Sequence, residues 1–229
     1  MGTDYDITVY CSSKNYDNKL HKHNDSKLKY INLKANGIQS IPYDIISIFK
    51  SLKDSEVLLI LGVSGCLVLP IVKLLSNNKI LVNIDGLEWK RDKWGKFAKW
   101  FLKLSEKIAV KYADEIITDN KVITDYVKEE YNVNSYLIAY GGNHVTIEAL
   151  DEDVLKKHSF LNDKYSFKVC RIEPENNIHV ILEAFSNSIT NNFVLVGNWE
   201  NSDYGRKLKI KYSAFKNIFL LDPIYNQKV

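Results

Sequence analysis

The stretch EVLLILGVSGCLVLPIVKLLSNNKILVNID, residues 56–85, decides the fold class of this chain. It opens with an apolar run, passes through a glycine turn into a helical pattern over Gly65–Leu75, and closes with a second apolar run, Lys79–Ile84. Two short strands on either side of one helix are typical of a parallel sheet. The longest apolar run, Val57–Val72, is broken by glycine and proline and is shorter than the roughly 18 residues that cross a bilayer. We therefore expect a strand, a turn and a helix of an α/β protein.

The same alternation continues on both sides of this unit. In the first part of the chain we expect strands at Asp6–Cys11, Lys29–Leu33, Glu56–Leu61, Lys79–Ile84, Glu115–Thr118 and Ser135–Ala139, and helices at Tyr43–Leu52, Gly65–Leu75, Lys93–Tyr112 and Lys121–Glu130. A polar, acidic stretch over Thr146–Lys164 predicts a linker or boundary helix. Beyond it we expect strands at Ser166–Cys170, Phe193–Val196 and Asn217–Leu221, and helices at Asn177–Ser188 and Asp203–Phe215. The sequence therefore predicts an α/β fold with two domains, 1–145 and 165–229, joined by a linker at 146–164, and the second domain holds only half of a doubly wound sheet.

Charge and cysteine usage narrow the class of protein. Lys and Arg number 31, Asp and Glu number 28, and the net charge of +3 is too small for a nucleic-acid-binding domain. The first residues, MGTDYD, are polar and no cationic stretch leads into an apolar segment, so we predict no signal peptide and expect a cytoplasmic protein. The cysteines Cys11, Cys66 and Cys170 lie far apart at the edges of apolar runs, which favours reduced packing residues over disulfides.

Common cofactor and metal motifs are absent from the sequence. No G-x-G-x-x-G or Walker loop occurs, which argues against a nicotinamide enzyme and against a P-loop ATPase. The turn from Gly62 to Gly65 has the wrong spacing for a phosphate loop and resembles a plain strand-to-helix turn. His21 and His23 have no third ligand at a recognisable spacing, so we predict no metal site and no bound cofactor.

The segment IDGLEWKR, residues 84–91, follows a buried strand at the position where open α/β sheets bind ligands. Asp85 and Glu88 could accept hydrogen bonds from a polyhydroxylated substrate, and Lys90 or Arg91 could contact a phosphate. The alternative is an ordinary loop that caps the next helix and carries solvated charges. Spacing alone does not separate these two interpretations.

The predicted helix Lys93–Tyr112 combines an apolar stripe with basic flanks. The stripe consists of Phe97, Phe101, Leu104, Ile108 and Tyr112, at helical spacing. Between residues 90 and 111, eight cations and two anions give a local charge of +6. Such helices lie on anionic bilayers, and the membrane-surface candidates are Lys93, Lys96, Lys99, Trp100 and Lys103. The alternative is that the stripe packs on the sheet while the lysines face solvent, and the two arrangements are compatible.

Two segments of the second part share one layout. RIEPENN, residues 171–177, follows a strand and precedes a helix, so the Arg171 guanidinium and the amides of the helix start could bind one anion. Glu173 and Glu175 could instead pair with Arg171. LVGNW, residues 195–199, also follows a strand, and Gly197 allows a ligand or a loop to approach the backbone.

Taken together, these segments resemble the nucleotide-sugar glycosyltransferases of family four, and within them the bacterial rhamnosyltransferase-like group that builds surface polysaccharides. The matching pieces are DITVYC at 6–11, IDGLEWKR, YGG at 140–142, RIEPENN, LVGNW and LLDPIYNQKV at 220–229. The resemblance covers nearly the whole chain. It implies a GT-B architecture, in which two Rossmann-like domains face each other across a cleft, with the acceptor on the first domain and the donor on the second, here incomplete.

The resemblance also implies an activity and its residues. The reaction is the retaining transfer of a sugar, expected to be rhamnose, from a dTDP- or UDP-linked donor to a lipid-linked or oligosaccharide acceptor at the inner membrane face, without a metal. The catalytic residues implied are Arg171 and Asp85. The donor side comprises Arg171, Glu173, Asn176, Asn177, Gly197 and Asn198. The acceptor side comprises Asp85, Gly86, Glu88, Trp89, Lys90, Arg91, Tyr140 and Gly141.

Three departures from the family pattern accompany the resemblance. Asn176 stands where many members have a lysine. The family's first strand and its Gly-rich loop do not precede DITVYC, and the Gly-rich, Glu-containing donor segment does not follow the last strand. These departures predict a fragment of such an enzyme. They also leave open a second interpretation, a non-catalytic module that binds a membrane surface or a partner protein.

Overall fold

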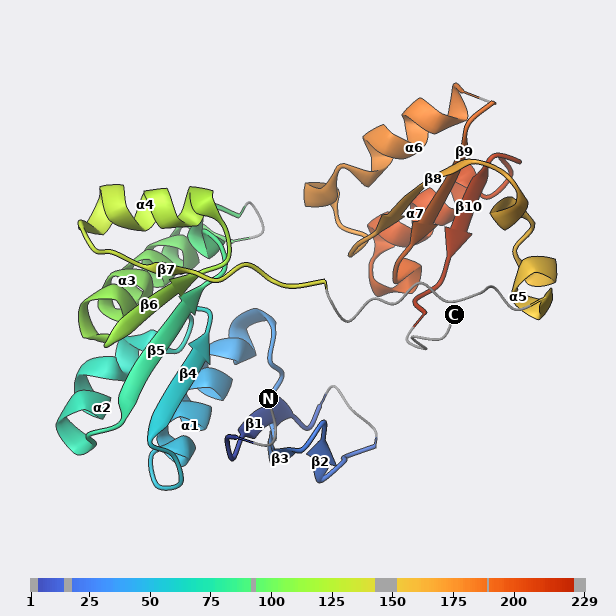
Figure 1. Cartoon of the computed structure of the whole chain (residues 1–229). Helices are drawn as coiled ribbons and strands as arrows, with labels where there is room; N and C mark the ends of the chain where they lie inside the picture. Colours follow the sequence, from blue (N-terminus) through green and yellow to red (C-terminus); the bar gives the residue numbers. More distant parts are fainter. Residues whose placement is uncertain (1–3, 15–17, 92–93, 143–151, 189, 225–229) are drawn as a thin grey trace. The chain divides into compact units, whose positions relative to one another are not determined.

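The computed structural model describes residues 4–14, 18–91, 94–142, 152–188 and 190–224. The chain divides into two compact units, Met1–Gly142 and Asn143–Val229, which we describe separately (Figure 1). Both units are built from parallel strands and intervening helices, so the predicted α/β fold class is confirmed. None of the described helices is long and apolar enough to cross a membrane.

A four-stranded parallel sheet forms the centre of the first unit. Its strands are β4 (Val57–Leu61), β5 (Lys79–Ile84), β6 (Glu115–Thr118) and β7 (Tyr136–Leu137), in that spatial order. The helices are α1 (Ser40–Ser51), α2 (Leu69–Leu75), α3 (Lys96–Tyr112) and α4 (Lys121–Tyr131), with 3-10 turns η1 (Gly37–Gln39), η2 (Cys66–Val68) and η3 (Glu88–Lys90). Strands β5 and β6 begin and end at the predicted residues.

One face of this sheet carries the core of the first unit. Leu58, Ile80 and Val82 point to that face and pack with Val72 of α2 and Val127 of α4. All four helices contribute to this single cluster. The opposite face of β4 is open: Val57, Leu59 and Leu61 are 50%, 57% and 71% exposed. The described helices therefore cover the sheet on one side, whereas a Rossmann-like sheet has helices on both.

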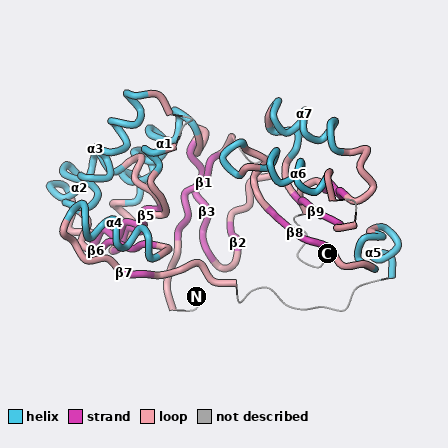
Figure 2. The backbone as a smooth tube through the Cα atoms, turned by 90° about the horizontal axis from the view of Figure 1, so that it is seen from above, coloured by secondary structure: helices cyan, strands magenta, loops and turns pink. Residues whose placement is uncertain are grey.

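A second, smaller sheet of the first unit was not separated from the first by the sequence pattern. Strand β1 (Thr8–Ser12) runs parallel to β3 (Ser26–Ile31), and the two-residue strand β2 (Lys22–His23) pairs antiparallel with β3 (Figure 2). No hydrogen-bonded ladder joins these strands to β4–β7 in the described residues. The segment that carries His21 and His23 forms one arm of a hairpin, whose turn at Asn24 and Asp25 has positive φ angles of 45° and 64°.

The second unit holds three parallel strands in the order β10–β9–β8. These are β8 (Tyr165–Val169), β9 (Asn192–Val196) and β10 (Ile218–Leu221), with helices α6 (Ile178–Ser186) and α7 (Asp203–Tyr212) between them. Near the start of the unit lie α5 (Glu152–Lys157) and the 3-10 turn η4 (Ser159–Asn162); η5 (Pro174–Asn176) and η6 (Trp199–Asn201) follow β8 and β9. Strand β9 is central and its last four residues are buried, so it organises the core with Trp199 and Leu182.

Local side-chain chemistry sets several helix ends. The Asn120 side chain accepts a hydrogen bond from the Ile123 amide at 3.0 Å and caps the start of α4. Helix α4 ends at Asn132, whose φ of 55° is the left-handed conformation common at helix ends. Ser202 caps α7 in the same way by accepting from Gly205 at 3.1 Å.

Candidate functional site

A cavity lies at the carboxyl ends of the strands of the second unit. Its volume is about 240 Å³, and the lining residues include Cys170, Arg171, Ile172, Gly197 and Asn198. They come from the loops after β8 and β9, where parallel sheets bind ligands. Of the donor-side residues expected from the sequence, Arg171, Gly197 and Asn198 meet at this cavity.

The Arg171 side chain is exposed and unpaired within the described part of the chain, so the pairing with Glu173 or Glu175 considered above is not formed. Its main-chain carbonyl accepts hydrogen bonds from the Asn176 side-chain amide at 2.7 Å and from the Glu173 amide at 3.0 Å. The Asn176 side chain therefore stabilises the conformation of the loop between β8 and α6. A guanidinium left unpaired at a cavity is suited to an anionic ligand.

The start of helix α6 differs from the expectation of free amides beside Arg171. The Tyr204 hydroxyl of α7 accepts a hydrogen bond from the His179 amide at 3.0 Å and lies 2.9 Å from the His179 Nδ1 atom. The Val180 amide is bonded to the Asn177 carbonyl at 3.1 Å. The first turn of α6 thus has internal partners, and Arg171 is the cationic residue among the described residues that line the cavity. Asn177 itself has a φ of 53° and begins the helix.

Gly197 is required by packing between two loops. A Cβ atom at this position would lie 2.6 Å from the Cys170 carbonyl oxygen and 2.6 Å from the Ile172 side chain. Next to it, Asn198 accepts a hydrogen bond from the Glu200 amide at 3.2 Å and begins η6. Of the two roles considered for Gly197, the structure therefore shows the close approach of a loop.

Trp199 is a structural residue that the sequence reasoning did not single out. It is fully buried, and its indole N–H donates to the Leu221 carbonyl at 2.9 Å, which fixes the end of β10 beside β9. A tryptophan two residues after a glycine at a strand end was the available signal.

Acidic side chains gather at the carboxyl end of the sheet in the first unit. Asp85 follows β5 and Asp119 follows β6, the neighbouring strand. Desolvation raises the pKa of Asp85 from its usual value, and the charges of Glu88 and Asp119 raise it further. Asp119 was missed from the sequence, although its position one residue after a strand was visible.

The Asp44 carboxyl of α1 is a second group that the sequence did not reveal. It accepts a hydrogen bond from the Ser64 hydroxyl, in the turn after β4. Burial raises the pKa of Asp44 to about 6. Because Asp44 reaches this turn only through the packing of α1, no local pattern pointed to it.

The charges of the segment 84–91 are partly neutralised by one another. Arg91 pairs with Glu88 at 2.9 Å, and the Lys90 ammonium lies 5.3 Å from the centre of the Trp89 ring. Gly86 leaves open space around its Cα atom. The structure therefore places the candidate acceptor side chains in one turn, with the Arg91 charge already paired.

The YGG segment also reaches this sheet. The Tyr140 hydroxyl accepts a hydrogen bond of 3.3 Å from the buried Asn83 side chain of β5, while the Tyr140 residue as a whole is 73% exposed. Gly141 is exposed and has open space around it. Tyr140 thus lies beside the strand that carries Asp85.

Helix α3 buries a face that is displaced from the predicted apolar stripe, although Ile108 and Tyr112 of that stripe are partly buried against the core. The buried positions are Leu102, Ser105, Glu106, Ala109 and Val110, whereas Phe97 is 78% exposed. Two of these positions are polar, and each has a partner: Ser105 donates to the Val63 carbonyl at 2.5 Å, and Glu106 accepts from Tyr126 at 2.6 Å. Because Ser105 and Glu106 are polar, the hydrophobic periodicity does not indicate that their side of the helix is buried.

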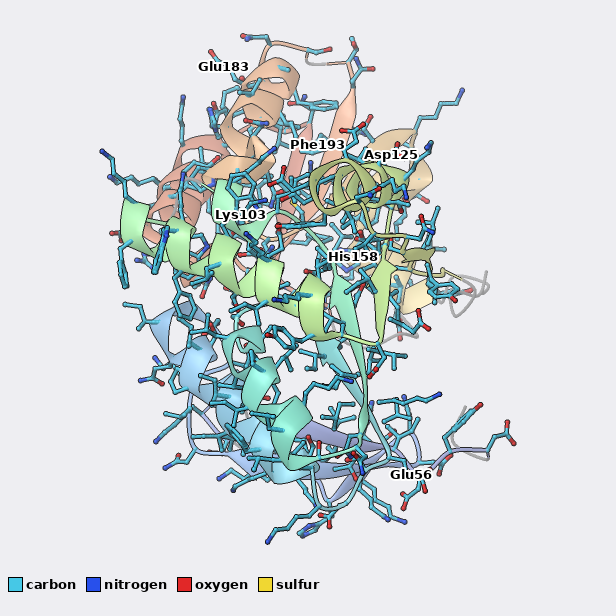
Figure 3. All side chains as sticks on the ribbon, turned by 90° about the vertical axis from the view of Figure 1, so that its left-hand side faces the viewer. Glu56, Lys103, Asp125, His158, Glu183 and Phe193 are labelled. Carbon is cyan, nitrogen blue, oxygen red and sulfur yellow. The ribbon has the colours of Figure 1, made fainter. Side chains whose placement is uncertain are left out.

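The membrane-surface candidates separate into two groups. Phe97 and Trp100 form an exposed ring pair with centroids 5.8 Å apart, and Lys96 is exposed beside them, with Lys99 partly buried. Lys103 of α3, labelled in Figure 3, instead pairs with Glu130 of α4 at 2.8 Å. Lys93 lies outside the described residues.

Metal ligands do not cluster in the described ranges: no group of three or more His, Cys, Asp or Glu side chains is placed to hold an ion. The free cysteines Cys11 and Cys170 are partly buried and Cys66 is buried.

Comparison with known proteins gives one family match. A family model described as a domain of unknown function, DUF1972, matches residues 2–143. No curated protein sequence matches the chain.

Several solved structures share the fold. A protein described as a UDP-N-acetylglucosamine 2-epimerase from Listeria monocytogenes aligns with a TM-score of 0.55 at 12% identity, over 89% of this chain and 57% of its own. MnaA of S. aureus, solved with UDP, aligns with a TM-score of 0.54 at 15% identity, over 87% and 56%. TarM aligns with a TM-score of 0.50 at 15% identity, over 83% and 38%. The parallel α/β units thus resemble the Rossmann-like domains of GT-B enzymes and epimerases. The chain spans little more than half of the length of the Listeria protein and of MnaA, and less than half of that of TarM.

Proposed function

The chain belongs to the DUF1972 family, and on that premise we propose that it is part of a retaining glycosyltransferase. The second unit binds the diphosphate of a dTDP- or UDP-linked sugar, with rhamnose the expected sugar. The first unit binds a lipid-linked or oligosaccharide acceptor of surface polysaccharide synthesis, on the cytoplasmic side of the membrane. MnaA, which shares the fold, was solved with UDP, and this supports a nucleotide-sugar ligand.

The single observation that carries this proposal is the unpaired guanidinium of Arg171 at the cavity of the second unit. An arginine that is paired with a carboxylate of its own chain is not available to bind an anionic ligand. Here Asn176 and Glu173 hold the Arg171 main chain and leave its side chain available. Arginine offers two parallel N–H donors to a phosphate, which suits a diphosphate better than a point charge would.

The chemistry requires stabilisation of a leaving group. The bond between the anomeric carbon and the diphosphate oxygen breaks, the acceptor oxygen bonds to that carbon, and the acceptor proton passes to a donor phosphate oxygen. Negative charge grows on the diphosphate as it leaves, so Arg171 stabilises the transition state more than the ground state. No separate protein base is needed for this step.

The acceptor role falls to the acidic turn of the first unit. Asp85 and Glu88 accept hydrogen bonds from sugar hydroxyls and orient the attacking one. The raised pKa of Asp85 reflects desolvation that a bound sugar would increase. Tyr140 adds a hydroxyl beside β5.

Titration of the chain with UDP and with dTDP tests the donor site, because a diphosphate binds before any acceptor is known. We expect Arg171→Ala to weaken binding by at least tenfold in calorimetry. Lys207→Ala is the matched control: it removes one exposed positive charge from α7 of the same unit and should change affinity less than twofold. In the intact enzyme Arg171→Ala should slow transfer by about 10². Equal binding by wild type and Arg171→Ala would remove Arg171 from the mechanism and with it the proposal.

A second candidate function is a membrane-binding module without catalysis. The observation that favours it is the exposed pair Phe97 and Trp100 at the start of α3, with Lys96 exposed beside it. Aromatic rings that enter the headgroup region and lysines that meet anionic lipids are the two parts of an interfacial site.

Flotation with anionic and neutral vesicles distinguishes this candidate. We expect wild type to float with anionic vesicles at low salt, and the double variant Phe97→Ala, Trp100→Ala to stay at the bottom. Val122→Ala, which shortens an exposed apolar side chain on α4, is the control and should float like wild type. Absence of wild-type flotation at low salt would reject the membrane surface in both candidate functions.

A further inference from the structure

A lysine ammonium surrounded by aromatic rings lies next to the turn that carries the acceptor residues. The Lys103 Nζ atom is 4.8 Å from the ring centre of Trp89, 4.9 Å from that of Tyr126 and 4.9 Å from that of Tyr131. Helix α3 supplies the lysine, α4 supplies the two tyrosines, and η3 supplies the tryptophan. We call these four residues with Glu106 and Glu130 the Lys103 cluster.

Two carboxylates pair with the ammonium of the cluster. Lys103 pairs with Glu130 at 2.8 Å and with the fully buried Glu106 at 3.3 Å. The Tyr126 hydroxyl donates to Glu106 at 2.6 Å, and the Tyr131 hydroxyl donates to the same oxygen. Desolvation opposes the charge of Lys103, but its hydrogen bonds to Glu130 and Tyr126 outweigh this and raise its pKa. The ammonium is therefore charged at neutral pH and held in place by both helices.

The ring of Trp89 lies against this cation. Its indole N–H is buried and has no hydrogen-bond partner among the residues that the structure describes. Among the described residues, two ammonium groups lie at the π system of the ring, Lys103 at 4.8 Å and Lys90 at 5.3 Å. Lys103 joins Trp89 to α3 and α4, and Lys90 of the same turn also reaches α4, with its Nζ atom 5.9 Å from the centre of the Tyr126 ring.

Trp89 in turn sits at the middle of the acceptor turn. The Lys90 amide donates to the Leu87 carbonyl at 2.8 Å, and the Arg91 amide donates to the Glu88 carbonyl at 3.2 Å. Trp89 lies within both of these hydrogen-bonded turns. A change in the position of Trp89 therefore acts on the backbone of the turn that carries Glu88.

We propose that Lys103 is a positioning residue, which holds the segment 84–91 in its binding geometry through Trp89. The role in acceptor binding rests on the proposed function; the anchoring of the segment does not. If Lys103 only joined α3 to α4, removal of its charge would destabilise α4 and leave the segment 84–91 unchanged. If Lys103 also positions the segment, removal of its charge would increase the local unfolding of residues 84–91.

Amide hydrogen exchange of the full chain separates the two roles, because it needs no substrate. The variant Lys103→Met removes the charge and keeps the length of the side chain. We expect about a tenfold faster exchange of the Lys90 and Arg91 amides than in wild type. Lys103→Arg retains a cation that stacks on tryptophan and should restore exchange to within about threefold of wild type.

Two further variants keep the test decisive. Lys107→Met is the matched control, an exposed lysine one turn along the same helix, and should leave the segment unchanged. If Lys103→Met unfolds because Glu106 is left as an uncompensated buried charge, the double variant Lys103→Met, Glu106→Gln removes both charges. Faster exchange at Lys90 and Arg91 in the folded variant supports the inference. Exchange that is unchanged there, or that rises only in α4, overturns it.

A different result would contradict the proposed function. Wild type that binds neither UDP nor dTDP would remove the glycosyltransferase proposal and leave the exchange result standing. In the intact enzyme, Lys103→Met should raise the acceptor KM by about tenfold with little change in the donor KM.

Discussion

The side-chain amide of Asn176 donates a hydrogen bond of 2.7 Å to the main-chain carbonyl of Arg171. This contact closes the loop between β8 and α6 from inside. It gives a physical reason for an asparagine at a position where many family-four glycosyltransferases have a lysine: the residue shapes the loop that presents the guanidinium. The positive charge of the cavity then rests on Arg171.

Loss of this contact should weaken ligand binding less than loss of the guanidinium. In Asn176→Ala we expect UDP or dTDP affinity to fall about threefold to fivefold, with a stability loss of about 1 kcal/mol for one hydrogen bond. Calorimetry and urea unfolding measure the two effects. Affinity reduced as much as in Arg171→Ala would mean that Asn176 contacts the ligand itself.

Gly197→Ala should destabilise the second unit by at least about 2 kcal/mol, since the new Cβ atom would meet backbone that cannot move aside. The predicted contact is 2.6 Å to the Cys170 carbonyl oxygen. Urea unfolding followed by circular dichroism measures the midpoint. Gly86→Ala, where no atom lies within 4 Å, is the control and should shift the midpoint very little. Equal midpoints for the two variants would contradict the packing role of Gly197.

Asp44 should make stability depend on pH. Burial raises its pKa to about 6 from the ordinary 3.8, so between these values the folded chain keeps a proton that the unfolded chain has released. Stability therefore falls as pH rises through this range, by up to about 3 kcal/mol at pH 7. Asp44→Asn should be more stable than wild type at pH 7.5 and should lack this slope in urea unfolding from pH 4 to 7.5. A slope that persists in the variant would assign it to another group.

The three thiols should differ in reactivity. Burial raises the pKa of the Cys66 thiol to about 12, whereas Cys11 and Cys170 are partly buried with pKa values raised by desolvation. A thiol reagent at pH 8 should label Cys66 only after denaturation and the other two slowly in the native protein. Mass spectrometry of labelled peptides checks the order. Fast native labelling of Cys66 would show that the turn after β4 opens readily.

The regular elements could be predicted because their signal is local. Strand β5 (Lys79–Ile84) alternates with helices in a pattern that only a parallel sheet satisfies, and its ends matched the prediction. Strand β2 (Lys22–His23) has two polar residues and no apolar pattern, so its pairing depends on the neighbouring backbone. The buried face of α3 was predicted only in part, because Glu106 is buried by partners on α4 that the sequence does not bring together.

The residues of the candidate site also divide into those that the sequence predicts and those that only the packing of the helices reveals. Arg171 and Asp85 were visible because each directly follows a strand. Tyr204 was not, although its hydroxyl caps α6, because it reaches His179 from another helix. Ligand-binding residues at strand ends follow from the order of elements, while hydrogen bonds between distant helices follow from packing.

The uncovered side of β4 has a practical consequence for handling the protein. Val57, Leu59 and Leu61 form a row of β-branched and aliphatic groups on a strand with one unpaired edge among the described residues, and the row itself bears no charge. Bare edges of this kind recruit strands from other molecules. Concentrated samples should self-associate through this strand, and a lysine introduced in place of Leu59 should keep them monodisperse.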